Sequence, residues 1–278
     1  IHLNSFMQFT LLYPGYKAKA VTFSYDDGII QDKETVSILN KYHLKGTFNL
    51  NSGQSGEEKI RDDLNCSHLV LKDDFHIYDG HEIASHTYSH PHLETLTFDQ
   101  QKLQFLTDKI DLERLIGKKV LGAAYPYGTY NSDTLKALEE LGFKYCRTTK
   151  STYEFSLPSN FLLWHPTIHH RDPLLFPTLD RFFESNDQLA LFYLWGHSYE
   201  FALDKNFDLL DKFCDIVSQK KDILSATNYE IYSYVSASQM VYYRKGFFYN
   251  PSRENIYLKV KDDKLVIPQG GSLAYEDK

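Results

Sequence analysis

The chain has 278 residues, of which 42% are hydrophobic and 15% aromatic. This is enough for one large domain, or for one domain with a small appendage. The formal net charge is −7 and there is no long basic run, so a nucleic-acid partner is disfavoured, because phosphate binding needs clustered Lys and Arg. No apolar stretch reaches the roughly 18 residues that a membrane span requires. The three cysteines are scattered and lack CxxC spacing, which argues against a disulfide framework or a cysteine-based zinc site.

The amino-terminal stretch, residues 1–14, lacks the charged start and the long apolar run of a secretory signal. Free thiols are commonly buried and mildly favour a reducing compartment. We therefore expect a cytoplasmic protein, with the missing initiator Met indicating an upstream piece.

Along the first 220 residues, short apolar runs alternate with helical patterns, which is typical of βα units in a parallel sheet or barrel. The expected strands are 20–25, 46–50, 82–85, 120–125, 143–148, 162–168 and 189–195. The expected helices are 32–42, 98–116, 132–141 and 207–219, the second with an apolar face at Leu103, Leu106, Ile110 and Leu115. Residues 51–79 are polar and aperiodic, and predict a long loop over a functional face. Seven strand candidates favour closure into a barrel.

The pattern changes after residue 226. A helix is expected at 228–240, followed by short strands at 247–249, 256–260 and 264–267 that are separated by turn signals. We therefore expect a barrel in residues 1–226, and a helix with short β strands in residues 227–278, packed on the barrel.

Two adjacent carboxylates, Asp26 and Asp27, end the first expected strand in the segment Ser-Tyr-Asp-Asp-Gly. Such a pair is stable where a cation or a proton neutralises one member. Since neighbouring side chains of an extended segment point to opposite sides, one carboxylate can bind metal while the other handles a proton. An Asp-Asp-Gly surface turn is the alternative.

A histidine pair, His86 and His90, follows the third expected strand. Two His at this spacing lie on one face of a helical turn and form a recurrent zinc clamp. Pro91 should end any helix there. The neighbouring His81 and His92 leave a chance pairing as the alternative.

A third histidine, His197, follows Trp195 and Gly196 after an apolar strand. Its position suits proton transfer, because the pKa of imidazole lies near neutrality, although a structural His is the alternative. One Asp and two His would leave an open position for water, which is typical of a catalytic metal site. The spare carboxylate and this third His would then supply a base and an acid.

These motifs resemble those of the polysaccharide deacetylase family, also called the NodB homology domain or carbohydrate esterase family 4. The first motif, Ser/Thr-Phe-Asp-Asp-Gly, is met by residues 24–28, the second, His-Ser/Thr-x-x-His, by 86–90, and the fifth, an apolar residue followed by x-His, by 195–197. The third, Arg-x-Pro-Tyr/Phe-Gly, reads Ala-Tyr-Pro-Tyr-Gly at 124–128 and lacks its Arg, and the fourth, an Asp-Trp segment, is missing. The resemblance covers residues 20–197.

The resemblance implies an α/β fold, a distorted (β/α)7 barrel of the NodB type, which here carries the small C-terminal β appendage. It implies removal of N-acetyl or O-acetyl groups from an oligo- or polysaccharide with one divalent ion, Zn²⁺ first and Co²⁺ or Ni²⁺ as alternatives. Asp27, His86 and His90 would be the ligands. Asp26 would be the base, His197 the acid, and the backbone N–H of Tyr127 the oxyanion donor.

Four further residues are expected to bind substrate: Trp195, Tyr125, His169 and Arg147. Arg147 is also the candidate to replace the missing Arg of the third motif. His169 lies in residues 164–172, which match no motif; alternation would put it on one strand face with His165 and Thr167. Hydrolysis of a non-sugar amide by the same fold, or an inactive carbohydrate-binding relative, is the alternative function.

Overall fold

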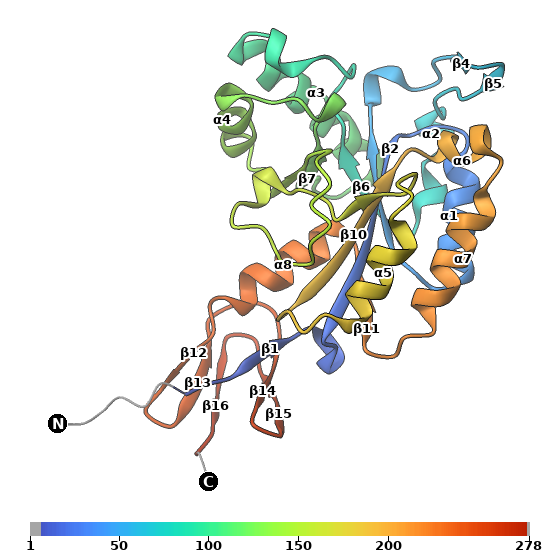
Figure 1. Cartoon of the computed structure of the whole chain (residues 1–278). Helices are drawn as coiled ribbons and strands as arrows, with labels where there is room; N and C mark the ends of the chain where they lie inside the picture. The colour runs from blue at the N-terminus through green and yellow to red at the C-terminus, as the bar shows by residue number, and fades with distance from the viewer. Residues whose placement is uncertain (1–6, 277–278) are drawn as a thin grey trace.

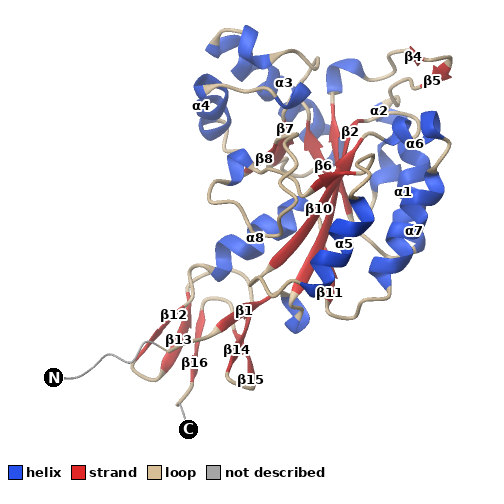
Figure 2. Ribbon diagram, in the orientation of Figure 1, coloured by secondary structure: helices blue, strands red, loops and turns tan. Residues whose placement is uncertain are grey.

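The computed structural model describes residues 7–276, and a curled parallel sheet forms its centre (Figures 1 and 2). The strand order is β8-β7-β6-β3-β2-β10-β9, and β11 pairs with the first half of β2. The strands are β2 (Lys19–Asp27), β3 (Gly46–Leu50), β6 (Glu82–Ser85), β7 (Gly122–Ala124), β8 (Tyr145–Arg147), β9 (Ile168–His169), β10 (Ala190–Gly196) and β11 (Ile223–Ser225).

The segment between β8 and β10 brings the two edges of this sheet together. Trp164 forms a parallel bridge with Arg147 at the end of β8, and β9 pairs with β10. The predicted distorted α/β barrel is confirmed, and each of the seven strands expected before residue 200 has a counterpart in the sheet. The strand expected at 162–168 is much shorter, because residues 161–163 form the 3-10 turn η6 (Phe161–Leu163).

Helices cover the sheet where the apolar patterns predicted them: α1 (Asp32–Lys41), α3 (Phe98–Ile116), α4 (Ser132–Glu140) and α7 (Phe207–Ser218). α1 packs against α7, and α3 against α4. Two further helices, α5 (Leu175–Glu184) and α6 (Ser198–Asp204), were not predicted. The apolar core lies between these helices and the strands.

The polar excursion at residues 51–79 lies against the carboxyl end of β2. It contains η2 (Ser52–Gln54), the hairpin strands β4 (Ile60–Arg61) and β5 (Leu64–Asn65), α2 (Leu71–Asp74) and η3 (Phe75–Tyr78). The backbone N–H of Leu69 donates to the carbonyl of Gly28 at 2.9 Å, and that of Ile30 to the carbonyl of Ser67 at 3.0 Å. The excursion is therefore fixed beside the Asp26–Asp27 pair.

The C-terminal part begins with α8 (Asn228–Ser238) and continues as short antiparallel strands. These are β12 (Tyr242–Arg244), β13 (Phe247–Asn250), β14 (Ile256–Val260), β15 (Asp263–Ile267) and β16 (Gly271–Ala274). An amino-terminal strand, β1 (Thr10–Leu12), pairs with β14, so the small β region draws on both ends of the chain. The domain boundary at residue 226 stays a prediction.

Within residues 7–276, no helix has the length and apolarity that crossing a bilayer demands. Cys66, Cys146 and Cys214 are free and buried. Residues 1–6, on which the expectation about a signal segment partly rests, lie outside the described residues.

Candidate active site

The predicted site residues gather at the carboxyl ends of the parallel strands. Asp26 and Asp27 end β2, His86 directly follows β6, and His197 directly follows β10. Because β3, β2 and β10 are neighbours and β6 adjoins β3, these ends meet at one edge of the barrel. The fold therefore unites residues that are far apart in sequence.

Asp27, His86 and His90 form a compact group in which the possible ligand atoms all lie within 4.8 Å of one another. The Oδ1 atom of Asp27 is 3.6 Å from Nε2 of His86 and 3.5 Å from Nε2 of His90. The two His do not share a helical turn as predicted. Thr87 and His90 adopt left-handed φ angles of 68° and 55°, so a tight loop folds the second imidazole back. Asn51 holds this loop by donating to the carbonyls of His86 and Thr87.

The hydrogen bonds of this group leave its ligand atoms free for a metal. Nδ1 of His86 donates to the carbonyl of Ala124 at 2.8 Å, so the lone pair of the neutral ring is on Nε2, which faces Asp27. Oδ1 of Asp27 is buried and accepts no hydrogen bond from the described residues. One carboxylate oxygen and two imidazole nitrogens are the donors of a catalytic zinc site, so the residues fit a divalent ion.

The charge states also suit coordination. Burial alone would raise the pKa of Asp27, but His197, His86, His90 and Lys59 together lower it to about 2. Burial, followed by the field of His86, lowers the pKa of His90 to about 4. At neutral pH the carboxyl group is therefore ionised and this imidazole neutral, which are the forms that bind metal.

Asp26 is held by two donors, Arg147 and Asn49. Nη2 of Arg147 lies 2.6 Å from Oδ1 of Asp26, and Nδ2 of Asn49 donates to the same oxygen at 2.8 Å. Burial opposes ionisation of Asp26, but Arg147, His86 and His197 outweigh it and lower the pKa. Asp26 is thus an oriented, ionised carboxylate. The motif gave no signal for Asn49, which lies beside Asp26 only because β3 pairs with β2.

A second group surrounds Glu200 on α6. Its Oε2 atom lies 3.1 Å from Nε2 of His169, 3.1 Å from Nε2 of His170 and 3.4 Å from Nδ1 of His197. The same oxygen accepts the backbone N–H of His197 at 2.9 Å. Burial would lower the pKa of His197, but Glu200, Asp27 and Asp26 raise it to about 9. His197 is therefore protonated at neutral pH.

His169, His170 and Glu200 also have the donor types of a metal site. The tautomer of His169, however, argues against a metal ion at this group. Nδ1 of His169 accepts the backbone N–H of Arg171 at 3.1 Å, so the proton of the neutral ring is on Nε2 and points at Glu200. The group is a network of imidazoles around one carboxylate. Neither Glu200 nor His170 belongs to a predicted motif; a Glu three residues after His197, at a helix start, was the available signal.

The four predicted substrate-binding residues differ in burial and in contacts. Tyr125 is fully buried and its hydroxyl donates to the carbonyl of Leu162 at 2.6 Å, so its side chain presents no free surface at the site. Arg147 is also fully buried, so it presents no surface to a substrate. It contacts Asp26, which it was predicted to orient. Trp195 is 7% exposed, with the Arg147 guanidinium 4.4 Å from its ring, and offers little area to a sugar. His169 is half-buried in the Glu200 network.

The segment 164–172 does not present one continuous face to the site. Nδ1 of His165 contacts the hydroxyl of Thr148 at 2.6 Å, and the hydroxyl of Thr167 donates to the carbonyl of Glu154 at 3.1 Å. Of the three residues expected on one face, only His169 reaches the Glu200 network. The short length of β9 explains this, because alternation holds only within a regular strand.

Tyr127 lies in the turn after β7 with a φ of 58° and a side chain that is 55% exposed. Its ring stacks on His92, with centroids 3.8 Å apart, and meets the edge of His90 at 4.5 Å. This exposed ring lies beside His90 and therefore presents more free surface at the site than Tyr125 or Trp195 does.

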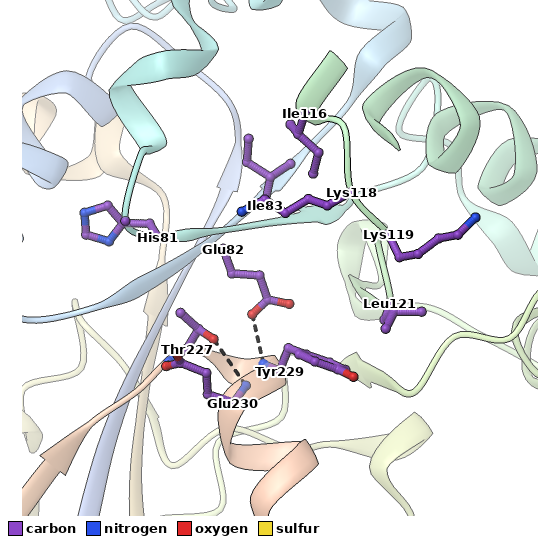
Figure 3. Close-up of a pocket in the computed structure, with 11 residues that line it drawn as sticks. His81, Glu82, Ile83, Ile116, Lys118, Lys119, Leu121, Thr227, Tyr229 and Glu230 are labelled. Atoms are coloured by element: carbon purple, nitrogen blue, oxygen red, sulfur yellow. Dashed lines mark hydrogen bonds between the residues drawn. The ribbon is translucent and has the colours of Figure 1, made fainter. Parts of the chain in front are cut away.

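A separate cavity of about 360 Å³ lies at the opposite, amino-terminal end of β6 (Figure 3). Its half-buried carboxylate, Glu82, accepts hydrogen bonds from the hydroxyls of Thr47 and Tyr145 and from the backbone N–H of Tyr229. These bonds tie the barrel to the start of α8. Because the Glu82 carboxylate already accepts three hydrogen bonds from the protein, its role is structural. This cavity is therefore not the candidate site.

Comparisons with known proteins agree with this geometry. A sequence model of the family named polysaccharide deacetylase matches residues 14–146. YxkH of Bacillus subtilis, named as a candidate polysaccharide deacetylase, is 27% identical over 48% of this chain and 45% of its own length. The peptidoglycan-N-acetylglucosamine deacetylase of Bacillus cereus is 28% identical over 55% of this chain and 58% of its own. The chain thus spans about half the length of the curated relatives it matches.

Solved structures show the same fold. A candidate polysaccharide deacetylase from Mycobacterium smegmatis aligns with a TM-score of 0.61 and 18% identity, over 84% of this chain and 95% of that one. The Xyl-CE4 domain of a xylanase from the hindgut metagenome of Trinervitermes trinervoides aligns with a TM-score of 0.54 and 14% identity, over 82% and 95%. The chain therefore resembles polysaccharide deacetylases in sequence over residues 14–146, and it has the fold of these two structures.

Proposed function

We propose that this protein is a metal-dependent hydrolase that removes N-acetyl or O-acetyl groups from an acetylated oligo- or polysaccharide. One observation carries the proposal. Asp27, His86 and His90 present three free ligand atoms within 4.8 Å of one another, beside the ionised carboxylate of Asp26. A divalent ion held there, with Zn²⁺ the first choice, would lower the pKa of a bound water and polarise an acetyl carbonyl.

The chain's own residues supply the proton transfers. Asp26 accepts the proton of the attacking water, and Arg147 and Asn49 orient it for that step. His197, kept protonated by Glu200, donates a proton to the departing sugar nitrogen or oxygen. The backbone N–H of Tyr127 stabilises the developing oxyanion. The proposal thus assigns Asp26 as the base and His197 as the acid.

Two relatives support the substrate class. The Bacillus cereus protein is named as a deacetylase of N-acetylglucosamine in peptidoglycan, and the termite-gut domain belongs to a multidomain xylanase. The first name indicates an amide, and the second indicates a glycan context for the same fold. The choice between amide and ester is therefore part of the test.

The test is acetate release after chelation, with and without added Zn²⁺, from N-acetylated chito-oligosaccharides and O-acetylated xylo-oligosaccharides. We expect zinc-dependent acetate from at least one set, and none from the Asp26→Asn protein with zinc restored. No acetate from either set, with zinc bound to the wild-type protein, would refute the deacetylase proposal in favour of a non-sugar amidase or an inactive binding protein.

A further inference from the structure

Two cations of the polar excursion, Lys59 and Arg61, lie beside the proposed active site. The backbone N–H of Lys59 donates to the hydroxyl of Ser67 at 3.1 Å, and the carbonyl of Ser67 accepts the N–H of Ile30. Ile30 is three residues beyond Asp27. The position of Lys59 is thus tied to the loop that follows the proposed metal ligand, and its charge acts on the Asp27 carboxylate.

Arg61 approaches the other side of the site through one aromatic ring. Its guanidinium carbon lies 4.6 Å from the centroid of the Tyr199 ring, and that ring lies 5.3 Å from the imidazole of His197. Arg61 is therefore one side chain away from the proposed catalytic acid. The hairpin of β4 and β5 stands at this rim of the barrel, near α6 (Figure 1).

These two charges are not compensated within residues 7–276. Neither side chain forms an ion pair there, and the buried Nε of Arg61 has no hydrogen-bond acceptor. Arg171 provides the contrast, because its guanidinium is paired with both carboxylate oxygens of Asp204 at 2.7 and 2.9 Å. Unpaired, partly buried cations are unfavourable unless a ligand neutralises them.

The acidic residues of the same hairpin do not neutralise these cations. Ile60, which lies between Lys59 and Arg61 in sequence, is 66% exposed, whereas the two cations are partly buried. The acidic neighbours are exposed and form no ion pair with either cation: Glu57, Glu58, Asp62 and Asp63.

The carboxylates of the site already have cationic partners. Asp26 faces Arg147, Glu200 faces His197, and Asp27 would face a divalent ion. Lys59 and Arg61 are left in excess. We infer that the substrate is an acetylated glycan with an anionic group, which these two residues bind while the acetyl group lies at Asp26. This inference rests on the proposed function and names its substrate class.

The experiment compares matched neutral and acidic substrates. One pair is N,N′-diacetylchitobiose and the GlcNAc–MurNAc disaccharide, which adds a lactyl carboxylate. The other is O-acetylated xylo-oligosaccharide without and with a glucuronic acid branch. We expect the acidic member of at least one pair to have a kcat/KM about five- to tenfold higher at low ionic strength, and expect the gap to shrink as salt is added.

Lys59→Ala and Arg61→Ala should each reduce the ratio of kcat/KM on the acidic member to kcat/KM on the neutral member, whereas a change at a remote lysine should not. Lys118→Ala is the matched control, because Lys118 is exposed and lines the cavity at the opposite end of the barrel (Figure 3). Equal rates on the acidic and neutral members of every hydrolysed pair would overturn the inference while leaving the deacetylase proposal intact. Absence of acetate from all four substrates would overturn both.

Discussion

Replacement of Glu200 by Gln removes the one charge around which three imidazoles are arranged. At 3.4 Å from Nδ1 of His197, the carboxylate stabilises an imidazolium by about 5 kcal/mol at an effective dielectric constant of about 20. That is enough to raise the pKa of His197 from 6.5 to about 9 against the opposing effect of burial. Gln keeps the size and one acceptor oxygen, so the charge is the main change.

The assay is kcat/KM for acetate release across pH 5–10 in the zinc-loaded protein. The wild type should lose activity as pH rises through about 9, where His197 loses its proton. In Glu200→Gln this alkaline limb should move to about pH 7 or below, with metal content unchanged. Asp204→Asn, on the same helix but paired with Arg171, is the control and should keep the wild-type profile. An unchanged alkaline limb in Glu200→Gln would refute the assignment of His197 as an acid poised by Glu200.

The same substitution makes a stability prediction whose sign follows from the raised pKa. Because His197 binds its proton more tightly when folded, it contributes stability that is fully present below about pH 6.5 and is lost as pH rises through about 9. The Tm of the wild type should therefore fall over this interval by more than that of Glu200→Gln. Parallel Tm curves for the two proteins would contradict this account.

Three further substitutions test the remaining parts of the site. Asp26→Asn should lower kcat by about 10²-fold or more with zinc still bound, and a wild-type rate would exclude Asp26 as the base. Arg147→Ala leaves a buried carboxylate unpaired, so we expect a loss of about 3–5 kcal/mol in denaturant unfolding together with lower kcat; an unaltered stability would show that the ion pair contributes nothing. His90→Ala should abolish the rise in Tm that zinc gives the wild type, whereas His92→Ala should retain it, and a zinc-stabilised His90→Ala protein would remove His90 from the ligand set.

Most helices and strands could be predicted from local sequence patterns. Helix α3 shows what such patterns predict correctly and what they miss. Both ends of this helix were predicted correctly, because Thr97 and Gln100 form a capping box and Gly117 ends it in a left-handed conformation. The predicted apolar face was wrong at two of its four positions, since Leu103 is 60% and Ile110 44% exposed, whereas Leu115 packs against the core.

The buried face of α3 instead includes two polar residues, Gln101 and Asp108. Asp108 accepts hydrogen bonds from the backbone of Ser52 and the hydroxyl of Ser85, and Gln101 accepts one from Thr134. These partners lie on segments that are distant in sequence. Periodicity counts apolar residues only, so it cannot identify buried polar side chains whose partners depend on the tertiary fold.

The same holds for the candidate site: residues in contiguous motifs were predicted, and residues brought there by the tertiary fold were not. Asp26, Asp27, His86, His90 and His197 were found because each lies in a short contiguous motif at a strand end. Asn49 and Glu200 were missed. Their roles arise from the pairing of β3 with β2 and from the start of α6, neither of which a motif encodes.

The central claim is that one divalent ion at Asp27, His86 and His90 is needed for acetate release. The most direct measurement is the rate of acetate release by metal-stripped protein as zinc is added in known equivalents. The account predicts no activity at zero zinc and a plateau at one equivalent per chain, with the Glu200 group left without metal. Activity in the stripped protein, or a plateau reached only at two equivalents, would contradict it.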